Sequence, residues 1–579
     1  MDQRAALMLN GQSTSEAPDV RFDLSGPKNN RPGYYDWDKN NFAPRLAVAW
    51  TPQADQGFMG ALTGNGKLVV RGGYSIVYDR IGTGLATQFD RAGAFGLSTI
   101  LASPFGGHNE DDPSIRFQGL SVIPPTLPEA PPGGFPQTPP SFAGIITEAL
   151  DGTIVTPYAH SFNVVVGREL PHGYSIEAAY VGRRGRNQLV RRDAAMPANL
   201  VDPQSGADYF GAVGQLIAAS QHIPRDADLS AYSSLAAIPY FENLFPDAAI
   251  DGLTATQRMA AEFNGHSPDF ITALYNADEF CEPACSKLGP FAYFSPQYDT
   301  LGIQSTIGRS AYDALQVSLR KRFSDGYQFD VNYTLGYAKD HASLLEGDKV
   351  FADFSNGGYT GFLINSWDPD KQYGNSDYDV RHLLNVNWIA DLPFGRDRHF
   401  GKDLNGILDA VIGGWTTAGV FRLTSGFPFT VINCRQCWST NWDLQGNAEM
   451  ATPGVLPDMG TTKDVIDGYP SPFKDPQAAV DFFRRARPGE VGLRNVLRGD
   501  GYYSIDLSLS KAWTMPWMKD HKVRFRWDTF NLTNTPRYDV QFLDVYPDRA
   551  ATFGRYYNTL ATCDGGAGRC MQFALRYEF

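Results

Sequence analysis

Apolar and polar residues alternate with a period of two along much of this chain. The pattern is clearest in GYQFDVNYTLGY, residues 326–337, where large apolar or aromatic groups alternate strictly with small or polar ones. This period predicts a β-strand with one face in an apolar medium and the other in a polar medium. We count eleven such strands of about ten residues, the length that a tilted strand needs to cross a bilayer. They are residues 45–50, 67–78, 160–169, 174–182, 312–322, 327–339, 381–391, 414–425, 503–512, 522–530 and 569–579.

The connections between these strands alternate in length. Short turns such as LPHG and FSDG contain the proline or glycine that hairpins require. The connections at residues 185–310, 340–379 and 426–500 are far longer than loops in compact domains. Short turns at one end and long loops at the other are typical of an outer-membrane β-barrel.

The polar face of the predicted strands carries few lysines and glutamates, which a sheet in bulk water should carry. It shows instead Asn385, Asn387, Ser504, Asp506 and similar residues, which suit a wet and partly enclosed lumen. We interpret Glu177, Asp330 and Asp506 as polar wall and not as an acid/base pair. Tyrosines near strand ends fit interfacial girdles. The alternative is a secreted β-sandwich or solenoid.

Composition excludes some classes of protein. The net charge of −13 argues against nucleic-acid binding, which needs a basic surface. No run of about 18 apolar residues is present, so a transmembrane helix is not expected. The first twenty residues show no basic segment followed by an apolar one, so a signal peptide is not predicted at Met1.

Several blocks resemble the Oar-like family of TonB-dependent receptors. They include NNFAPRLAVAW, GKLVVRGGYSIVYDR, SFNVVVGRELPHGYSIEAAYVGRRG, YDALQVSLRKRFSDGYQFDVNYTLGYAKD, DYDVRHLLNVNWIADLPFG, GGWTTAGVFRLTSGFPFTV and FRWDTFNLTNTPRY. These blocks run from about residue 40 to the C-terminus, in the order of the family. The resemblance implies a 22-stranded antiparallel barrel in the outer membrane, plugged by an N-terminal domain and driven by the TonB complex.

The plug, its TonB box and the first half of that barrel have no counterpart here. We therefore expect residues 1–43 to be an extracellular loop segment and residues 44–579 the C-terminal half of the barrel, an all-β fold. The expected partners are outer-membrane lipid, the absent plug and half-barrel, the TonB complex and the barrel-assembly machinery. Phe579 ends a strand of alternating aromatics that resembles the assembly signal of such barrels.

No motif of a hydrolase, a phosphate-binding loop or a metalloprotease is present, so we predict no enzyme, cofactor or metal site. The runs DADLSAY and EGDKVFAD match no defined calcium loop. The cysteines form three close pairs: Cys281 with Cys285, Cys434 with Cys437, and Cys563 with Cys570. We expect three disulfides in outer loops. A redox motif at CRQC or a zinc site among four of them remains the alternative.

The sequence does not name the ligand. Aromatic residues in the predicted outer loops could stack on a sugar or peptide, or could pack the loops together. The candidates are Tyr359, Trp367, Trp438 and Trp442. The predicted function is uptake through an outer-membrane barrel. The alternatives are an adhesion or structural barrel that transports nothing, and a secreted carbohydrate-binding β-protein.

Overall fold

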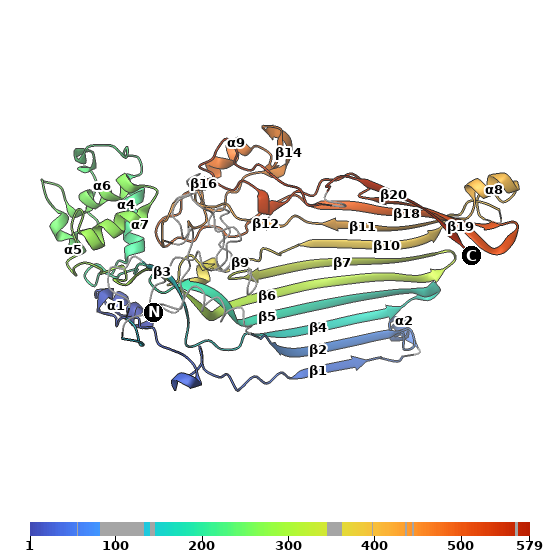
Figure 1. Cartoon of the computed structure of the whole chain (residues 1–579), viewed down its shortest axis with the longest axis horizontal. Coiled ribbons are helices and arrows are strands. Elements are labelled where there is room, and N and C mark those ends of the chain that lie inside the picture. Colours follow the sequence, from blue (N-terminus) through green and yellow to red (C-terminus); the bar gives the residue numbers. More distant parts are fainter. Residues whose placement is uncertain are drawn as a thin grey trace, which may run out of the picture.

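The computed structural model describes residues 1–54, 56–80, 133–138, 145–343, 362–396, 398–434, 437–442, 445–561 and 566–579. One long antiparallel sheet dominates this part of the chain (Figure 1). Its main path follows the chain order without crossovers. The strands of the path are β1 (Arg45–Trp50), β2 (Leu68–Tyr78), β4 (Tyr158–Glu169), β5 (Tyr174–Asp193), β6 (Tyr298–Ser324), β7 (Tyr327–Asp340), β10 (His382–Asp391), β11 (Trp415–Thr424), β18 (Tyr502–Met515), β19 (Met518–Phe530) and β20 (Cys570–Glu578).

Shorter strands extend this sheet at the end where the long connections lie. They are β3 (Ile145–Leu150) beside β6, β8 (Phe362–Leu363) beside β5, and β9 (Gly374–Asn375) beside β7. Three two-stranded sheets lie in the long connections. They pair β12 (Pro428–Phe429) with β17 (Leu497–Arg498), β13 (Glu449–Met450) with β16 (Phe483–Arg484), and β14 (Met459–Ile466) with β15 (Tyr469–Phe473).

Each strand of the main path has one apolar face, as the alternation predicts. In the register of the sheet, Val331 of β7 lies beside Val386 of β10, which lies beside Phe421 of β11, which lies beside Ile505 of β18. At β20, Phe573 and Leu575 on this face are 66% and 74% exposed. Because no protein layer covers this face of the described strands at β20, an apolar medium has to cover it.

The sheet is open in the described residues. β1 and β20 are its two edges. The closed 22-stranded barrel implied by the resemblance is therefore not seen here. Short turns join the strands at one end of the sheet, and the long connections project from the other (Figure 1).

One prediction about the connection between β5 and β6 is wrong. The strands are 20 and 27 residues long and stay paired as far as Asp193 and Gly302, well inside the predicted loop 185–310. The rest of this connection folds into helices, which were not predicted from the sequence, beside a sheet that is all-β as expected. The helices are α4 (Tyr209–Ser220), α5 (Pro239–Leu244), α6 (Ala255–His266) and α7 (Phe270–Tyr275).

These helices form one packed body, which we call the helical unit (residues 200–294). Its core is aromatic and includes Tyr240, Phe241, Phe263 and Tyr293, all fully buried. A capping box between Thr254 and Gln257 begins α6. The helices are held together by this shared apolar core.

The remaining helices are short and lie outside the helical unit. α1 (Asp2–Leu9) lies beside the helical unit, at the end of the sheet where the long connections gather (Figure 1). α2 (Gly57–Thr63) and α8 (Gly406–Ile412) lie at the opposite end, in the connections from β1 to β2 and from β10 to β11 (Figure 1). α9 (Pro476–Ala479) lies between β15 and β16.

Candidate functional site

The polar face of the sheet carries a continuous row of hydrophilic side chains across six strands. Adjacent strands pair these residues directly, so their side chains lie side by side on one face. A hydrogen bond of 2.8 Å joins Ser318 and Asn332 within the row. The row runs through Glu177, Ser318, Asn332, Asn385, Arg422 and Ser504.

Ion pairs link strands on the same face. Arg71 of β2 pairs with Glu177 of β5 across the intervening β4, and Arg320 pairs with Asp330 of the adjacent strand. Arg524 pairs with Glu578 at 3.1 Å. The side chains in these pairs are exposed by about a third or more, except that of Glu578, so each pair adds little to stability but keeps the face hydrophilic.

The long connections pack into a second layer, which we call the outer-loop assembly. It consists of the helical unit and the described parts of residues 362–381, 426–501 and 531–561. A second aromatic core holds the last two segments together, with Phe473 and Phe553 stacked at 5.2 Å between ring centroids. These two connections are therefore held to one another.

Arg494 is a polar centre of this assembly. Its guanidinium forms an ion pair of 2.7 Å with Asp340 at the end of β7 and donates 2.8 Å to Ser343. It also lies 3.4 Å from Asp377. The neighbouring Asn495 donates 2.6 Å to Asp377. One segment of the 426–501 connection is thereby fixed to the end of a strand and to the connection that follows it.

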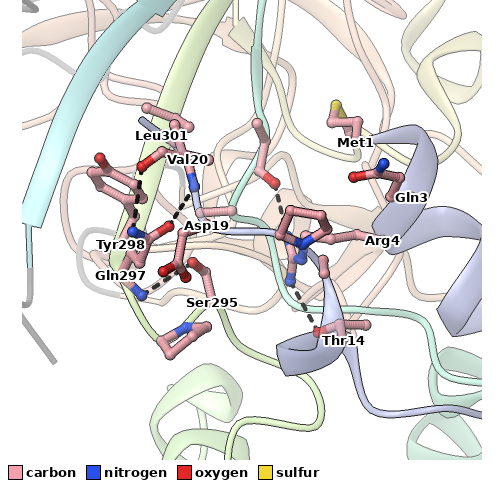
Figure 2. Close-up of a pocket in the computed structure, with 15 residues that line it drawn as sticks. Met1, Gln3, Arg4, Thr14, Asp19, Val20, Ser295, Gln297, Tyr298 and Leu301 are labelled. Carbon is pink, nitrogen blue, oxygen red and sulfur yellow. Dashed lines mark hydrogen bonds between the residues drawn. The ribbon is translucent and has the colours of Figure 1, made fainter. Parts of the chain in front are cut away.

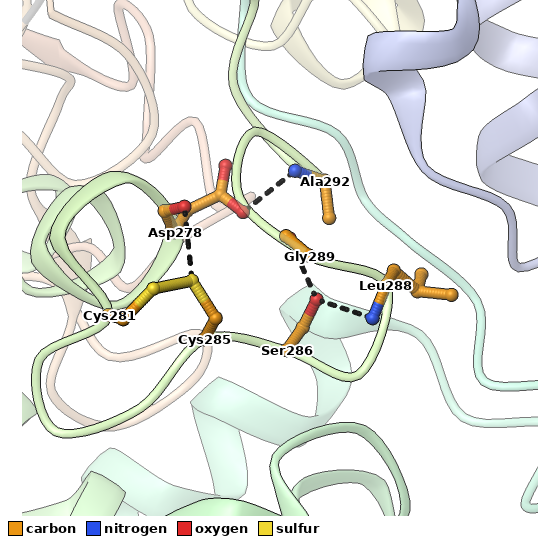
Figure 3. The surroundings of a disulfide bond; sticks show 7 residues. All are labelled: Asp278, Cys281, Cys285, Ser286, Leu288, Gly289 and Ala292. Atoms are coloured by element: carbon orange, nitrogen blue, oxygen red, sulfur yellow. Dashed lines mark hydrogen bonds between the residues drawn. A yellow bond between two sulfur atoms is a disulfide. The ribbon is translucent and has the colours of Figure 1, made fainter.

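Asp278 is the polar centre of the helical unit, in the segment that follows α7. Its carboxylate accepts hydrogen bonds from the backbone N–H groups of Ala292, Tyr293 and Phe294 at 2.8–3.0 Å. The side chain is fully buried, and burial raises the pKa of Asp278 to about 7. Figure 3 shows the Cys281–Cys285 disulfide beside it, with Sγ of Cys285 at 3.8 Å from the carbonyl oxygen of Asp278.

Arg4 on α1 joins the N-terminal segment to the helical unit. Its guanidinium donates to the carbonyl oxygens of Ala194 at 2.7 Å and Tyr293 at 3.0 Å, and burial lowers the pKa of Arg4 to about 10. A cavity of about 90 Å³ lies beside it, between the N-terminal segment and residues 295–301 (Figure 2). Since pockets for organic ligands measure about 300–1,000 Å³, this cavity is too small for a peptide or an oligosaccharide.

The structure places three of the four predicted loop aromatics, and all three are half-buried. Trp367 donates 2.8 Å from Nε1 to the carbonyl oxygen of Pro197. Trp442 packs edge-on against Tyr275 at 5.5 Å between ring centroids, and Trp438 packs against the core of the helical unit. All three therefore join one loop to another. Tyr359 lies outside the described residues.

The predicted cysteine pairs lie in or beside the long connections. Disulfides join Cys281 to Cys285 and Cys434 to Cys437. Cys570, at the start of β20, is also in a disulfide, and its predicted partner Cys563 lies outside the described residues. Phe579, the predicted assembly signal, is 91% exposed at the turn end of the sheet.

Sequence reasoning missed the residues that hold the outer-loop assembly together. Asp278, Arg494 and Arg4 act through contacts that are distant in sequence, which no local pattern indicates. The helical unit could have been found, because α4 buries Tyr209, Ala212, Val213 and Leu216 at helical spacing. The Thr254–Gln257 capping box was a second local signal.

The described residues contain no group of three or more histidine, cysteine or acidic side chains placed to hold a metal ion. None of the described helices has both the length and the apolar composition needed to cross a membrane.

Comparison with known proteins gives a family. Residues 3–572 match the family described as outer membrane beta barrel domain. No curated protein matches the sequence.

Solved structures resemble the chain at low identity. The outer membrane transporter YddB from Escherichia coli is 8% identical, with a TM-score of 0.33, over 93% of this chain and 40% of that one. The ferripyoverdine receptor of the Pseudomonas aeruginosa outer membrane is 8% identical, with a TM-score of 0.33, over 94% of this chain and 33% of that one. The siderophore receptor PirA from Acinetobacter baumannii is 7% identical, with a TM-score of 0.33, over 93% of this chain and 41% of that one.

The chain thus spans 33–41% of the length of these three proteins. The family match covers almost the whole chain and agrees with the long antiparallel sheet and its uncovered apolar face. This chain belongs to the outer membrane beta barrel domain family and is a protein of the outer membrane.

Proposed function

We propose that this chain is the C-terminal half of an Oar-like, TonB-dependent receptor that takes up a ligand through the outer membrane. The observation that carries the proposal is the polar row from Glu177 to Ser504, which lies on the face away from the lipid. The strands that carry this row extend from the short turns at one end of the sheet to the outer-loop assembly at the other. A hydrophilic wall beneath a fixed outer layer is what a ligand needs on its way through a barrel.

The proposal assigns separate roles to the two layers. The outer-loop assembly captures the ligand, and the polar face forms one side of its path. The chain performs no reaction, since its lumen carboxylates Glu177 and Asp330 are neutralised by arginines instead of being poised as an acid/base pair. A peptide or an oligosaccharide is the proposed class of ligand, because the lumen wall offers amides, hydroxyls and charges of both signs.

The second candidate is an adhesion or structural barrel that transports nothing. The packed helical unit favours it, since a rigid aromatic body on the cell surface can bind a partner without any import. The third alternative, a secreted carbohydrate-binding protein, disagrees with the outer-membrane localisation.

Photo-crosslinking of the complete gene product to the TonB C-terminal domain separates the two barrel functions without knowledge of the ligand. Transport predicts crosslinks in energised cells. Absence of crosslinks would contradict the proposal and favour adhesion.

Import of a fluorescent oligopeptide and of fluorescent maltoheptaose then tests the class of ligand. We expect accumulation of one of the two probes, and we expect that it is lost in cells that lack TonB. Surface binding that is equal with and without TonB would again favour adhesion.

A further inference from the structure

α2 and α8 lie at the turn end of the sheet and expose apolar side chains. On α8, Ile407 is 80% and Val411 is 64% exposed. On α2, Phe58 is 80% exposed. Exposed apolar groups of this size need a partner, because contact with water is unfavourable for each of them.

The last carbonyl groups of α8 receive hydrogen bonds from side chains of the sheet. Trp513 donates 2.7 Å from Nε1 to the carbonyl oxygen of Ala410, and Trp415 donates 2.7 Å from Nε1 to that of Val411. Lys511 donates 3.0 Å from Nζ to the carbonyl oxygen of Asp409, and it also donates to that of Gly413.

All three donors lie on the apolar face of the sheet. In the register of the sheet, Trp415 lies opposite Lys511, and Lys511 lies opposite Phe525. Phe525 in turn lies opposite Leu575 of β20, which is on the apolar face. Trp513 alternates with Lys511 along β18 and shares its face. α8 is therefore fixed to the lipid-facing side of the sheet and not to the lumen.

This arrangement stabilises the end of the helix most where water is scarce. The last carbonyls of a helix lack partners within the helix, and in water the solvent satisfies them. In the apolar part of a membrane interface they have to be satisfied by the protein itself. Two indoles and one ammonium supply these bonds at α8.

α2 repeats the arrangement at the other side of the sheet. Arg168 of β4 pairs with Leu68 and Ile176, which places it on the apolar face. Its guanidinium donates 2.6 Å to the carbonyl oxygen of Ala61, near the end of α2. In both connections, a side chain on the apolar face of the sheet therefore donates a hydrogen bond to a carbonyl group near the end of the helix.

We propose that α2 and α8 lie in the phospholipid leaflet at the turn end of the barrel, with their exposed apolar side chains between the acyl chains. The occupant is lipid because the helices continue an apolar face that lipid already covers in an outer-membrane protein. The approach to α8 also exposes Arg396 and Lys402, which suit the phosphate groups of that leaflet, beside the acidic Asp403 and Asp409. Arg398 is exposed as well, but it forms an ion pair of 3.7 Å with Asp391. The inference depends on the outer-membrane localisation and not on the proposed transport.

Spin labelling tests the proposal in isolated outer membranes that contain the complete gene product. Ile407→Cys and Val411→Cys carry nitroxides on the exposed side of α8, and Lys402→Cys is the matched control in the preceding loop. These positions are all exposed, so the substitutions should leave the fold intact. Collisions of the nitroxide with oxygen and with a water-soluble nickel chelate report whether lipid or water surrounds it.

Insertion predicts severalfold more collisions with oxygen, relative to the nickel chelate, at positions 407 and 411 than at position 402. Equal access of the nickel chelate to all three positions would place α8 in water and overturn the proposal. Shielding of positions 407 and 411 from both reagents would overturn it as well, because it would show a protein partner in place of lipid.

Discussion

At the scale of single residues, the alternation along β7 makes the sharpest prediction. Tyr327, Phe329, Val331, Tyr333 and Leu335 should face lipid, and Asp330 and Asn332 the lumen. The structure changes the best position for the test. Phe329 lies near the turn, paired with Lys321, whereas Val331 lies beside Val386, in the middle of β10.

Val331→Arg should therefore cost about 2–4 kcal/mol of the free energy of unfolding in a bilayer, because it places a charge near the midplane. Phe329→Arg should cost only about 0–1 kcal/mol, the value for positions near the interface. Asn332→Arg is the control on the opposite face and should cost far less than Val331→Arg. Refolding titrations into vesicles measure all three, and equal costs for Val331→Arg and Asn332→Arg would exclude this orientation.

A second residue-scale prediction concerns Asp278. Burial raises the pKa of its carboxyl group from 3.8 to about 7 in the folded chain. Between these values the folded state holds a proton that the unfolded state has lost. The contribution of Asp278 to the free energy of unfolding is therefore greatest below pH 4 and falls as the pH rises to 7, by at most about 4 kcal/mol.

Asp278→Asn cannot ionise, and so it should remove this pH dependence. It should also destabilise the helical unit at low pH. The carboxyl group of Asp278 accepts hydrogen bonds from backbone N–H groups, whereas the amide N–H₂ group of asparagine is itself a donor and cannot accept them. Limited proteolysis across a denaturant titration, with cleavage followed within residues 200–294, compares the two proteins at pH 5 and pH 7.5. An identical pH dependence in both proteins would contradict the assignment.

At the scale of elements, the disulfides stabilise short segments of the outer-loop assembly. We predict that Cys434–Cys437 and Cys563–Cys570 form in the protein, together with Cys281–Cys285. Because the loops they close are short, each adds about 2–3 kcal/mol at most. Mass spectrometry of the unreduced protein should show three bridges, whereas alkylation of all six thiols without reductant would disprove them.

The three described tryptophans of the loops show how elements are joined in this protein. Trp367, Trp438 and Trp442 each contact a segment distant in sequence. The sequence allows two roles for these rings, ligand stacking and loop packing, and these contacts favour loop packing. Ligand stacking would require at least one of these rings to be free in the outer layer.

At the scale of the whole molecule, the open sheet predicts that this chain does not close into a pore by itself. Within the part of the chain that the structure describes, β1 and β20 each have one unpaired edge, which exposes backbone groups. Each such group costs several kcal/mol in hydrocarbon, where water cannot satisfy it. We therefore expect residues 1–579, fused to a secretion signal, to aggregate or be degraded.

Heat-modifiable migration on a gel is the measurement for this prediction. The complete gene product should migrate as a folded barrel before heating, and the chain alone should not. A stable, heat-modifiable monomer of the chain alone that conducts ions would refute the prediction.

The sequence by itself determined the sheet. Eleven strands, their faces and the alternation of short and long connections follow from a period of two, because lipid or lumen contact is imposed on every second side chain along a strand. It also predicted three cysteine pairs, because the partners lie within a few residues, and two of these pairs are disulfides in the described residues. Only residues near in sequence take part in these features, so local patterns suffice.

Only the tertiary structure decided what happens beyond the strands. The extension of β5 and β6 to Asp193 and Gly302 depends on pairing between two segments that a long connection separates. The bonds of Arg4 to Ala194 and Tyr293, and of Arg494 to Asp340, join residues more than a hundred positions apart. The carbonyls of Asp409 and Ala410 at α8 find their donors on β18 for the same reason: the partner of a buried polar group is chosen by folding in space, which no local pattern encodes.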